Sequence, residues 1–229
     1  MDEAAVTGPR RRPPEGGYAR GEETRERIID AAFVVFADEG YRGASTRRIA
    51  AEAGVNPPAL QYYFDSKEGL HRACGETVVA RVMAHLAEPL EAARKALAGQ
   101  DREPAVEALC SLVGRMAEFA MVSHDDETWS RFHNRCQGDD IGPAFEVMDQ
   151  GIAKVLMSLC VELVARSIGR PADEPLVRLK GLLIMGQIAP FHAKRASMLK
   201  FMGWPDFDGD RLDLTRDLLC DHVRRLVTP

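Results

Sequence analysis

One short stretch of the chain, residues 54–70 (GVNPPALQYYFDSKEGL), collects side chains that suit contact with DNA. The amide of Gln61 can pair with the edge of an adenine, and tyrosine hydroxyls can reach phosphates. The small apolar surfaces of Pro58 and Ala59 can meet a thymine methyl and let the backbone approach the floor of the major groove. The residue types in this stretch therefore predict a surface that binds double-stranded DNA.

The local sequence predicts that this surface lies on a helix. Asn56 is a good N-cap, and Pro57 suits the first helical position, where its missing N–H would have had no partner. Leu60 and Phe64 are four residues apart and should face the core together. The remaining side chains of the helix, among them Tyr62, then project outward.

Two helices are expected before this one. A turn of about four residues that contains Gly54 joins the second of them to the helix over residues 57–64. Apolar residues recur at helical spacing from residue 24, and Gly40 supplies a stop. Ser45 then caps a short helix over residues 46–53 (TRRIAAEA), whose positive N-terminus, with Thr46, could hold a phosphate. Three short helices joined in this way are typical of a helix-turn-helix, and residues 57–64 would form its recognition helix.

Composition bounds the remaining possibilities. The 229 residues carry a net charge of −5, yet residues 40–72 hold five Lys or Arg against three acids, so positive charge is concentrated at the predicted DNA surface. The five cysteines form no CxxC pair and are expected to be reduced thiols. No apolar run approaches the roughly 20 residues that cross a bilayer, and no secretory signal stands at the N-terminus. We expect a cytoplasmic protein with no membrane partner.

Beyond Leu70 the chain reads as helix almost throughout, which predicts an all-α fold. Alternating strand patterns and repeats of fixed period are absent from the sequence. The helices are expected over residues 68–97 with a break near Pro89, and over 104–123, 127–137, 143–168, 175–202 and 210–227.

Residues 24–70 resemble the DNA-binding domain of a TetR-family transcriptional repressor. The resemblance rests on the motifs F-x-x-x-G-Y/F, I-A-x-x-A-G-V and Y-x-F-x-S-K-E-x-L, which follow one another without a gap. It implies an all-helical homodimer with an N-terminal helix-turn-helix and a C-terminal domain that binds a small-molecule inducer and dimerises. The implied division is a flexible Arg/Pro/Gly-rich arm over 1–21, a DNA-binding domain over 22–69 and a ligand-binding and dimerisation domain over 70–229.

The resemblance also assigns roles within the DNA-binding domain. Thr46, Tyr63 and Lys67 match positions that contact phosphates, whereas Arg47, Pro58 and Tyr62 match positions that often meet bases. Gln61 departs from the tyrosine common at its position, so its role, phosphate or base, is open. The full candidate set for DNA contact is Ser45, Thr46, Arg47, Asn56, Pro58, Ala59, Gln61, Tyr62, Tyr63 and Lys67.

Three C-terminal segments, "GPAFEVMDQGI", "LVARSIGRPADEPLVRLKGLLIMGQI" and "FMGW", resemble the CecR-like subgroup, which implies control of transport or efflux genes. Methionines and aromatic residues after Leu70 could line an adaptable apolar pocket, and three polar residues within apolar helices could orient an inducer. The candidate ligand-binding residues are Met116, Phe119, Trp129, Phe132, His133, Arg135, Met148, Met185, Gln187 and Phe191. A core or surface histidine is the competing interpretation of His133.

The last two helices carry the apolar residues for a four-helix dimer interface, which the family implies, although packing within one chain is an alternative. The candidate interface residues are Leu179, Leu182, Leu183, Gly186, Leu218, Leu219 and Val223. Arg10, Arg11, Arg12 and Arg20 could form a minor-groove arm or a solvated tail.

Two alternatives to a repressor stay open. One is a helical enzyme with an idle helix-turn-helix, although the sequence offers no catalytic motif for it, and we expect no metal site and no cofactor. The other is an activator or corepressor-dependent regulator of the same fold.

Overall fold

The computed structural model describes residues 16–122, 127–136, 138 and 141–228, and every regular element in these ranges is a helix. The all-α prediction is confirmed. Arg10, Arg11 and Arg12, the proposed minor-groove arm, lie outside the described residues. Within them, no helix is both long and apolar enough to span a bilayer.

The first helices form a compact head, which we define as α1 (Gly16–Gly43), α2 (Thr46–Ala53) and α3 (Pro57–Phe64). Helix α1 begins before the expected boundary at residue 22, and its predicted stop at Gly40 is a kink with φ 76°, after which the helix resumes to Gly43. Arg20, placed in the arm by the sequence, is exposed on α1.

Local capping explains where the helices of the head begin. The side chains of Ser45 and Asn56 accept hydrogen bonds from the backbone N–H groups of Arg48 and Ala59, at 3.2 and 3.1 Å. Gly54 ends α2 with φ 64°, a left-handed conformation in which glycine has no steric cost. The turn between α2 and α3 is therefore fixed by its own sequence.

The rest of the chain forms a helical body. Its helices are α4 (Lys67–His85), α5 (Ala87–Ala98), α6 (Arg102–Val122), α7 (Glu127–Cys136), α8 (Pro143–Met148), the π-helical turn η1 (Asp149–Ala153), α9 (Lys154–Ile168), α10 (Pro175–Gly186), α11 (Ala189–Ala193), α12 (Arg195–Met202) and α13 (Gly209–Leu226). The predicted break near Pro89 lies at Leu86, because proline is tolerated in the first turn of a helix and Pro89 occupies that turn of α5. The segment expected as one helix over 175–202 is three helices, and Pro190 lies in the first turn of α11.

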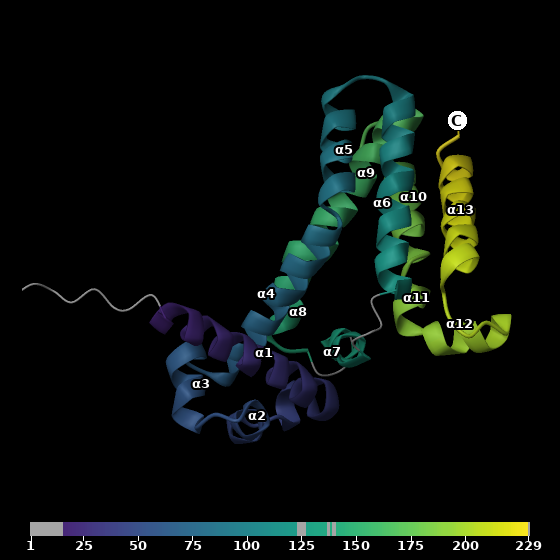
Figure 1. Ribbon diagram of the computed structural model, residues 1–229. Coiled ribbons are helices and arrows are strands. Elements are labelled where there is room, and N and C mark those ends of the chain that lie inside the picture. Colours follow the sequence, from purple (N-terminus) through teal and green to yellow (C-terminus); the bar gives the residue numbers. More distant parts are fainter. Residues whose placement is uncertain (1–15, 123–126, 137, 139–140, 229) are drawn as a thin grey trace, which may run out of the picture.

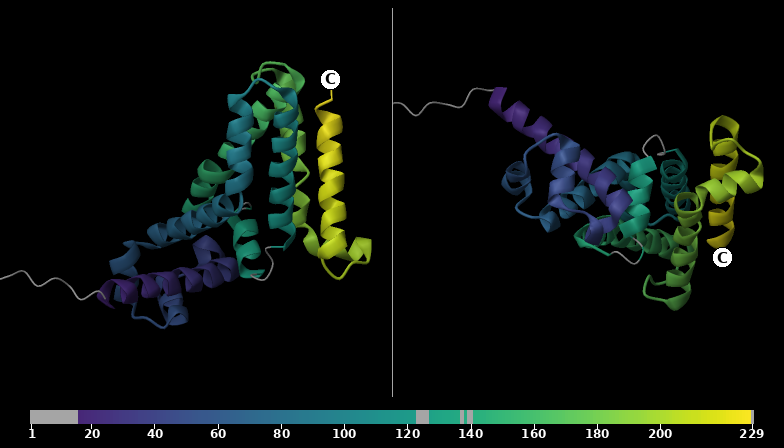
Figure 2. Two further views of the ribbon diagram at one scale, coloured as in Figure 1. Left: turned by 45° about the horizontal axis from the view of Figure 1, so that its top comes forward. Right: turned by 90° about the horizontal axis from the view of Figure 1, so that it is seen from below.

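The helices of the body form two groups that extend away from the head (Figure 1). One group contains α4, α5, α8 and α9, and the other contains α6, α10 and α13. Helix α7 lies against α1 of the head. Both further views keep α13 along the outside of α6 (Figure 2). Helix α6 is the central element, since it packs against α5, α9 and α13 and buries residues on several faces.

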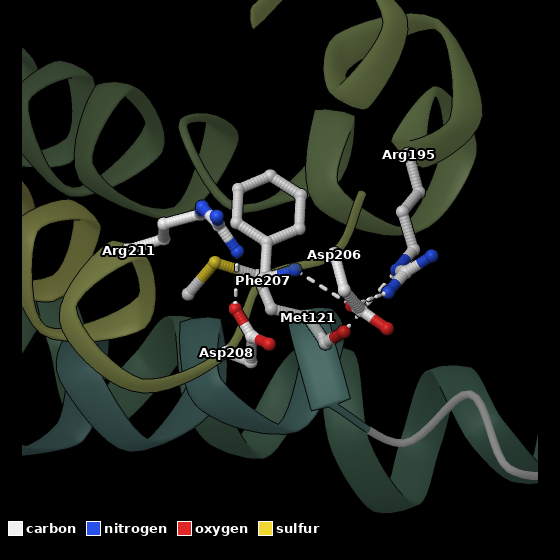
Figure 3. Close-up of polar contacts among 6 residues, drawn as sticks. All are labelled: Met121, Arg195, Asp206, Phe207, Asp208 and Arg211. Atoms are coloured by element: carbon white, nitrogen blue, oxygen red, sulfur yellow. Dashed lines mark hydrogen bonds and ion pairs between the residues drawn. The ribbon is translucent and has the colours of Figure 1, made fainter. Parts of the chain in front are cut away.

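The return from α12 to α13 is held against the end of α6 (Figure 3). Arg195 donates from Nε to the carbonyl of Met121 at 3.2 Å and pairs with the carboxylate of Asp206. Asp208 pairs with Arg211 at 2.6 Å. The contacts of Arg195 therefore connect this loop to the C-terminal end of α6.

Candidate DNA-binding face and ligand cavity

Helix α3 divides into the two faces that its sequence predicts. Leu60 and Phe64 are buried, with 3% and 7% of their surface exposed. Tyr62 is 82% exposed, and Pro58 and Gln61 are exposed beside it. An exposed aromatic ring of this size on a helix whose other face is fixed in a core is available for a partner.

The exposed end of α2 adds groups that suit phosphate and base contact. Ser45, Thr46 and Arg47 are all exposed, and Arg47 forms no ion pair with any described residue. Arg48, by contrast, pairs with Glu52 at 2.9 Å and lies 3.6 Å from Glu39. The free positive charge at this end of the head therefore belongs to Arg47 and to the N-terminus of α2.

Lys67 has a structural contact that the sequence did not reveal. Its ammonium donates to the backbone carbonyls of Tyr41 and Ala44 at 2.9 and 3.1 Å, and it lies 4.8 Å from the centre of the Tyr41 ring. Tyr41 in turn donates from its hydroxyl to Glu68 at 3.0 Å. An ammonium has three donors, so two can tie α4 to the end of α1 while the third is left for a phosphate.

A cavity of about 210 Å³ lies in the body, among α4, α6, α7, the η1–α9 segment and α10. Its wall is made of aliphatic and aromatic side chains with one imidazole. The lining residues are Val78, Val82, Leu86, Met116, Phe119, Trp129, His133, Ile152, Ala153, Leu156, Met185, Ile188 and Ala189. Five of the predicted ligand-binding residues are thus brought together: Met116, Phe119, Trp129, His133 and Met185.

The aromatic part of the wall is ordered by edge contacts. The ring centroids of Phe119 and Trp129 are 5.6 Å apart at an interplanar angle of 75°, and the centroid of the His85 ring lies 5.1 Å from that of Phe119. Burial lowers the pKa of His133, which favours the neutral imidazole at neutral pH. The described wall therefore carries no formal charge.

The other five predicted ligand residues lie elsewhere. Phe132 packs between the body and the head, Arg135 donates to carbonyls of α1, and Met148 is buried at the end of α8. Gln187 and Phe191 line a second hollow of about 370 Å³ near α12 and α13. The sequence missed Val78, Val82, Ile152 and the other aliphatic wall residues because a helical aliphatic residue looks the same whether it faces a core or a cavity.

Helix α7 touches both the cavity and the head. Trp129 and His133 line the cavity, whereas the ring centroid of Phe132 lies 4.9 Å from that of Phe33 in α1. Arg131 pairs with Asp38 at 2.6 Å. Ten residues therefore connect a ligand-sized space to the helix that supports the DNA-binding surface.

The guanidinium of Arg135 completes the contact between α7 and α1. It donates to the carbonyl oxygens of Ala37 and Asp38 at 2.9 and 2.7 Å. These carbonyls precede the kink at Gly40, where the backbone leaves helical φ and ψ angles. A positive charge at the C-terminal end of a helical segment is favourable, so this contact also stabilises α1.

The predicted dimer residues are mostly on the surface. Leu179, Leu182 and Leu183 of α10 are 53–56% exposed, and Leu218 of α13 is 61% exposed. Gly186 is exposed and Leu219 is partly buried. Val223 is fully buried in the core of its own chain, which leaves it out of this exposed row.

A three-helix DNA-binding head on a helical body defines the class of helix-turn-helix transcription regulators. The chain belongs to the TetR family: the profile for "Bacterial regulatory proteins, tetR family" matches residues 28–74, and the C-terminal domain profile of the "HTH-type transcriptional dual regulator CecR" matches residues 105–228. Both resemblances predicted from the motifs are confirmed.

Relatives and solved structures agree with this assignment. The dual regulator CecR of Shigella flexneri is 27% identical over 207 residues, which cover 89% of this chain and 91% of the relative. The FadR regulator of Bacillus subtilis, solved with stearoyl-CoA, has a TM-score of 0.57 at 18% identity and covers 86% of this chain and 96% of its own. NalD, the secondary repressor of the MexAB-OprM multidrug efflux pump in Pseudomonas aeruginosa, has a TM-score of 0.59 at 20% identity, with 90% and 96% covered. At these identities the two structures support the fold alone.

Proposed function

We propose that this regulator is a ligand-responsive repressor that binds a pseudo-palindromic operator as a homodimer and is released by a small molecule. The observation that carries the proposal is the double contact of α7, whose residues line an apolar cavity on one side and hold α1 of the head on the other. A ligand that fills the cavity can change the position of the head through this helix.

The DNA contacts are assigned from exposure and chemistry. Tyr62, Pro58 and Gln61 occupy the exposed face of α3 and would contact bases in the major groove. Thr46 and Tyr63 would hold phosphates, and the third donor of the Lys67 ammonium would do the same. Phosphate contacts supply affinity, whereas base contacts supply the choice of sequence.

The exposed leucines of α10 and α13 support a two-fold dimer. Leu179, Leu182 and Leu183 form a row of large apolar side chains with more than half of their surface in water, and Leu218 adds to it from α13. A row of this kind marks an interface, and a second copy that pairs α10 and α13 with their equivalents would cover it. Two recognition helices would then read half-sites about one DNA turn, roughly 34–36 Å, apart.

Coupling between ligand and DNA requires that the ligand prefer one arrangement of the head. A ligand shifts the equilibrium only by its differential affinity for the two arrangements. Helix α4 offers a second route beside α7, because it begins at Lys67 next to the head and lines the cavity with Val78 and Val82. The C-terminal domain matches the CecR profile. From the resemblance to this subgroup we infer transport or efflux genes as the targets, and the regulator would act on DNA in the cytoplasm.

The test is selection of operator fragments by the purified protein. We expect it to retain specific fragments from sheared DNA of its own genome, with a protected region that contains two inverted half-sites and a stoichiometry of one dimer per site or a multiple of it. Fragments drawn without sequence preference would overturn the proposal and favour a helical enzyme with an idle head. Reporter expression from a selected fragment that rises when the regulator is deleted supports repression, and a fall would establish an activator.

A further inference from the structure

The wall of the cavity specifies the chemistry of what it can hold. Among the residues that the structure describes, none of the thirteen that line it is Lys, Arg, Asp or Glu. Burying a charge without a partner is very costly, so this wall disfavours acids and bases. The volume of about 210 Å³ is below the roughly 300–1,000 Å³ of sites for drug-sized ligands, whereas an apolar cavity of about 150 Å³ is known to hold benzene.

One residue that lines the cavity, Trp129, has a buried N–H without a hydrogen-bond acceptor in the part of the chain that the structure describes. Trp129 is 95% buried, and its indole Nε1 has no hydrogen-bond partner among the described residues. A buried N–H that is left unsatisfied destabilises the structure, and an acceptor on a ligand would remove that cost. The centroids of the Phe119 ring and the indole are 5.6 Å apart at an interplanar angle of 75°, a contact that favours this orientation of the indole.

We propose that the cavity binds a small, uncharged, flat molecule of about one ring that carries a hydrogen-bond acceptor, and that the indole N–H of Trp129 donates to this acceptor. This inference deepens the proposed function, since it names the ligand class of the same cavity. The aliphatic residues contributed by α4 and α9 cover the apolar part of the molecule. Trp129 lies on α7, so the same hydrogen bond holds the helix that contacts the head.

Three probes of nearly equal shape test the inference directly. Acetophenone is uncharged and carries a carbonyl, α-methylstyrene replaces that oxygen by a methylene group, and benzoate replaces the methyl group by a charged oxygen. The chain has two tryptophans, so protein labelled with ¹⁵N-tryptophan gives two indole N–H signals, and Trp204→Phe identifies the signal of Trp129. Titration of this signal yields both the affinity and the state of the N–H.

We expect acetophenone to move the Trp129 indole proton downfield and to bind about fivefold more tightly than α-methylstyrene, as one net neutral hydrogen bond allows. Benzoate should bind at least about tenfold more weakly than acetophenone, because its charge would have no partner in the wall. Trp129→Phe keeps an aromatic ring but removes the N–H, so the ratio of the affinities for acetophenone and α-methylstyrene should fall from about fivefold to about one, whatever the change in packing does to both.

Three outcomes would overturn the inference. Equal affinities for acetophenone and α-methylstyrene would exclude the hydrogen bond, tightest binding of benzoate would exclude the uncharged class, and no binding of any probe at 1 mM would exclude the one-ring size. None of these titrations contains DNA. Loss of the ligand class is therefore distinguishable from failure of the operator selection, which tests the proposed function itself.

Discussion

Replacing Lys67 by methionine tests the double use of its ammonium. Methionine keeps an unbranched apolar side chain but removes the two hydrogen bonds to the carbonyls of Tyr41 and Ala44. A hydrogen bond from a charged donor contributes about 1.5–3 kcal/mol in a buried setting, and partial exposure of Lys67 reduces this to about 1 kcal/mol each. The free energy of unfolding should therefore fall by about 2 kcal/mol.

The assay is urea denaturation followed by circular dichroism, with Lys95→Met as the control. Lys95 is exposed on α5 and makes no hydrogen bond or ion pair with any described residue, so its replacement should change stability by less than about 0.5 kcal/mol. If Lys67→Met is as stable as Lys95→Met, the link between α4 and the end of α1 is refuted.

DNA binding by Lys67→Met tests whether the third N–H of the Lys67 ammonium contacts a phosphate. The slope of log affinity against log salt should become shallower by about 0.9 for each protomer that loses a phosphate contact. An unchanged slope together with lowered stability would mean that Lys67 supports the head without touching the phosphate.

Three further predictions concern the cavity, the dimer and the thiols. Val82→Phe places a ring in the cavity of about 210 Å³ and should imitate a bound ligand. It should weaken operator binding at least about tenfold in an anisotropy titration, whereas Val155→Phe on the exposed surface should not. Equal operator affinities of the two variants would argue against coupling between the cavity and the head. Leu182→Glu puts a charge in the exposed leucine row and should convert the dimer to monomer in light scattering, with loss of operator binding; a stable dimer would place the interface elsewhere. A hydrogen bond from the Cys110 thiol lowers the pKa of Cys220, so iodoacetamide alkylation of Cys220, read by peptide mapping, should already be fast below about pH 8.5, where an ordinary thiol is half ionised. A rate that rises in parallel with that of an unfolded cysteine peptide would contradict the hydrogen bond.

The head was predictable from sequence because its determinants are local. Ser45 and Asn56 cap helices through N–H groups three residues away, and Gly54 provides the left-handed turn between them. The inward and outward faces of α3 follow from the spacing of Leu60 and Phe64 alone. The family motifs identify the same elements, because they include residues of α2, of the turn and of α3.

The cavity and its link to the head could be predicted only in part, because they depend on contacts between distant segments. Arg135 was expected to orient a ligand, yet its partners are the carbonyls of Ala37 and Asp38, which lie almost one hundred residues earlier in the chain. Trp129 and His133 were found through their unusual types. Val82 could not be found, since no property of its local sequence separates a cavity wall from a packed core.

Operator binding by the wild type and by Tyr62→Ala tests whether the exposed face of α3 recognises a DNA sequence. Each protein is titrated by fluorescence anisotropy against the DNA upstream of its own coding sequence and against a scrambled control, at two salt concentrations. The wild type should prefer the upstream DNA and bind it more weakly as salt rises, and Tyr62→Ala should lose about 1–3 kcal/mol of that preference while keeping its salt dependence. Equal affinity of both proteins for both DNAs would contradict sequence recognition by the exposed face of α3.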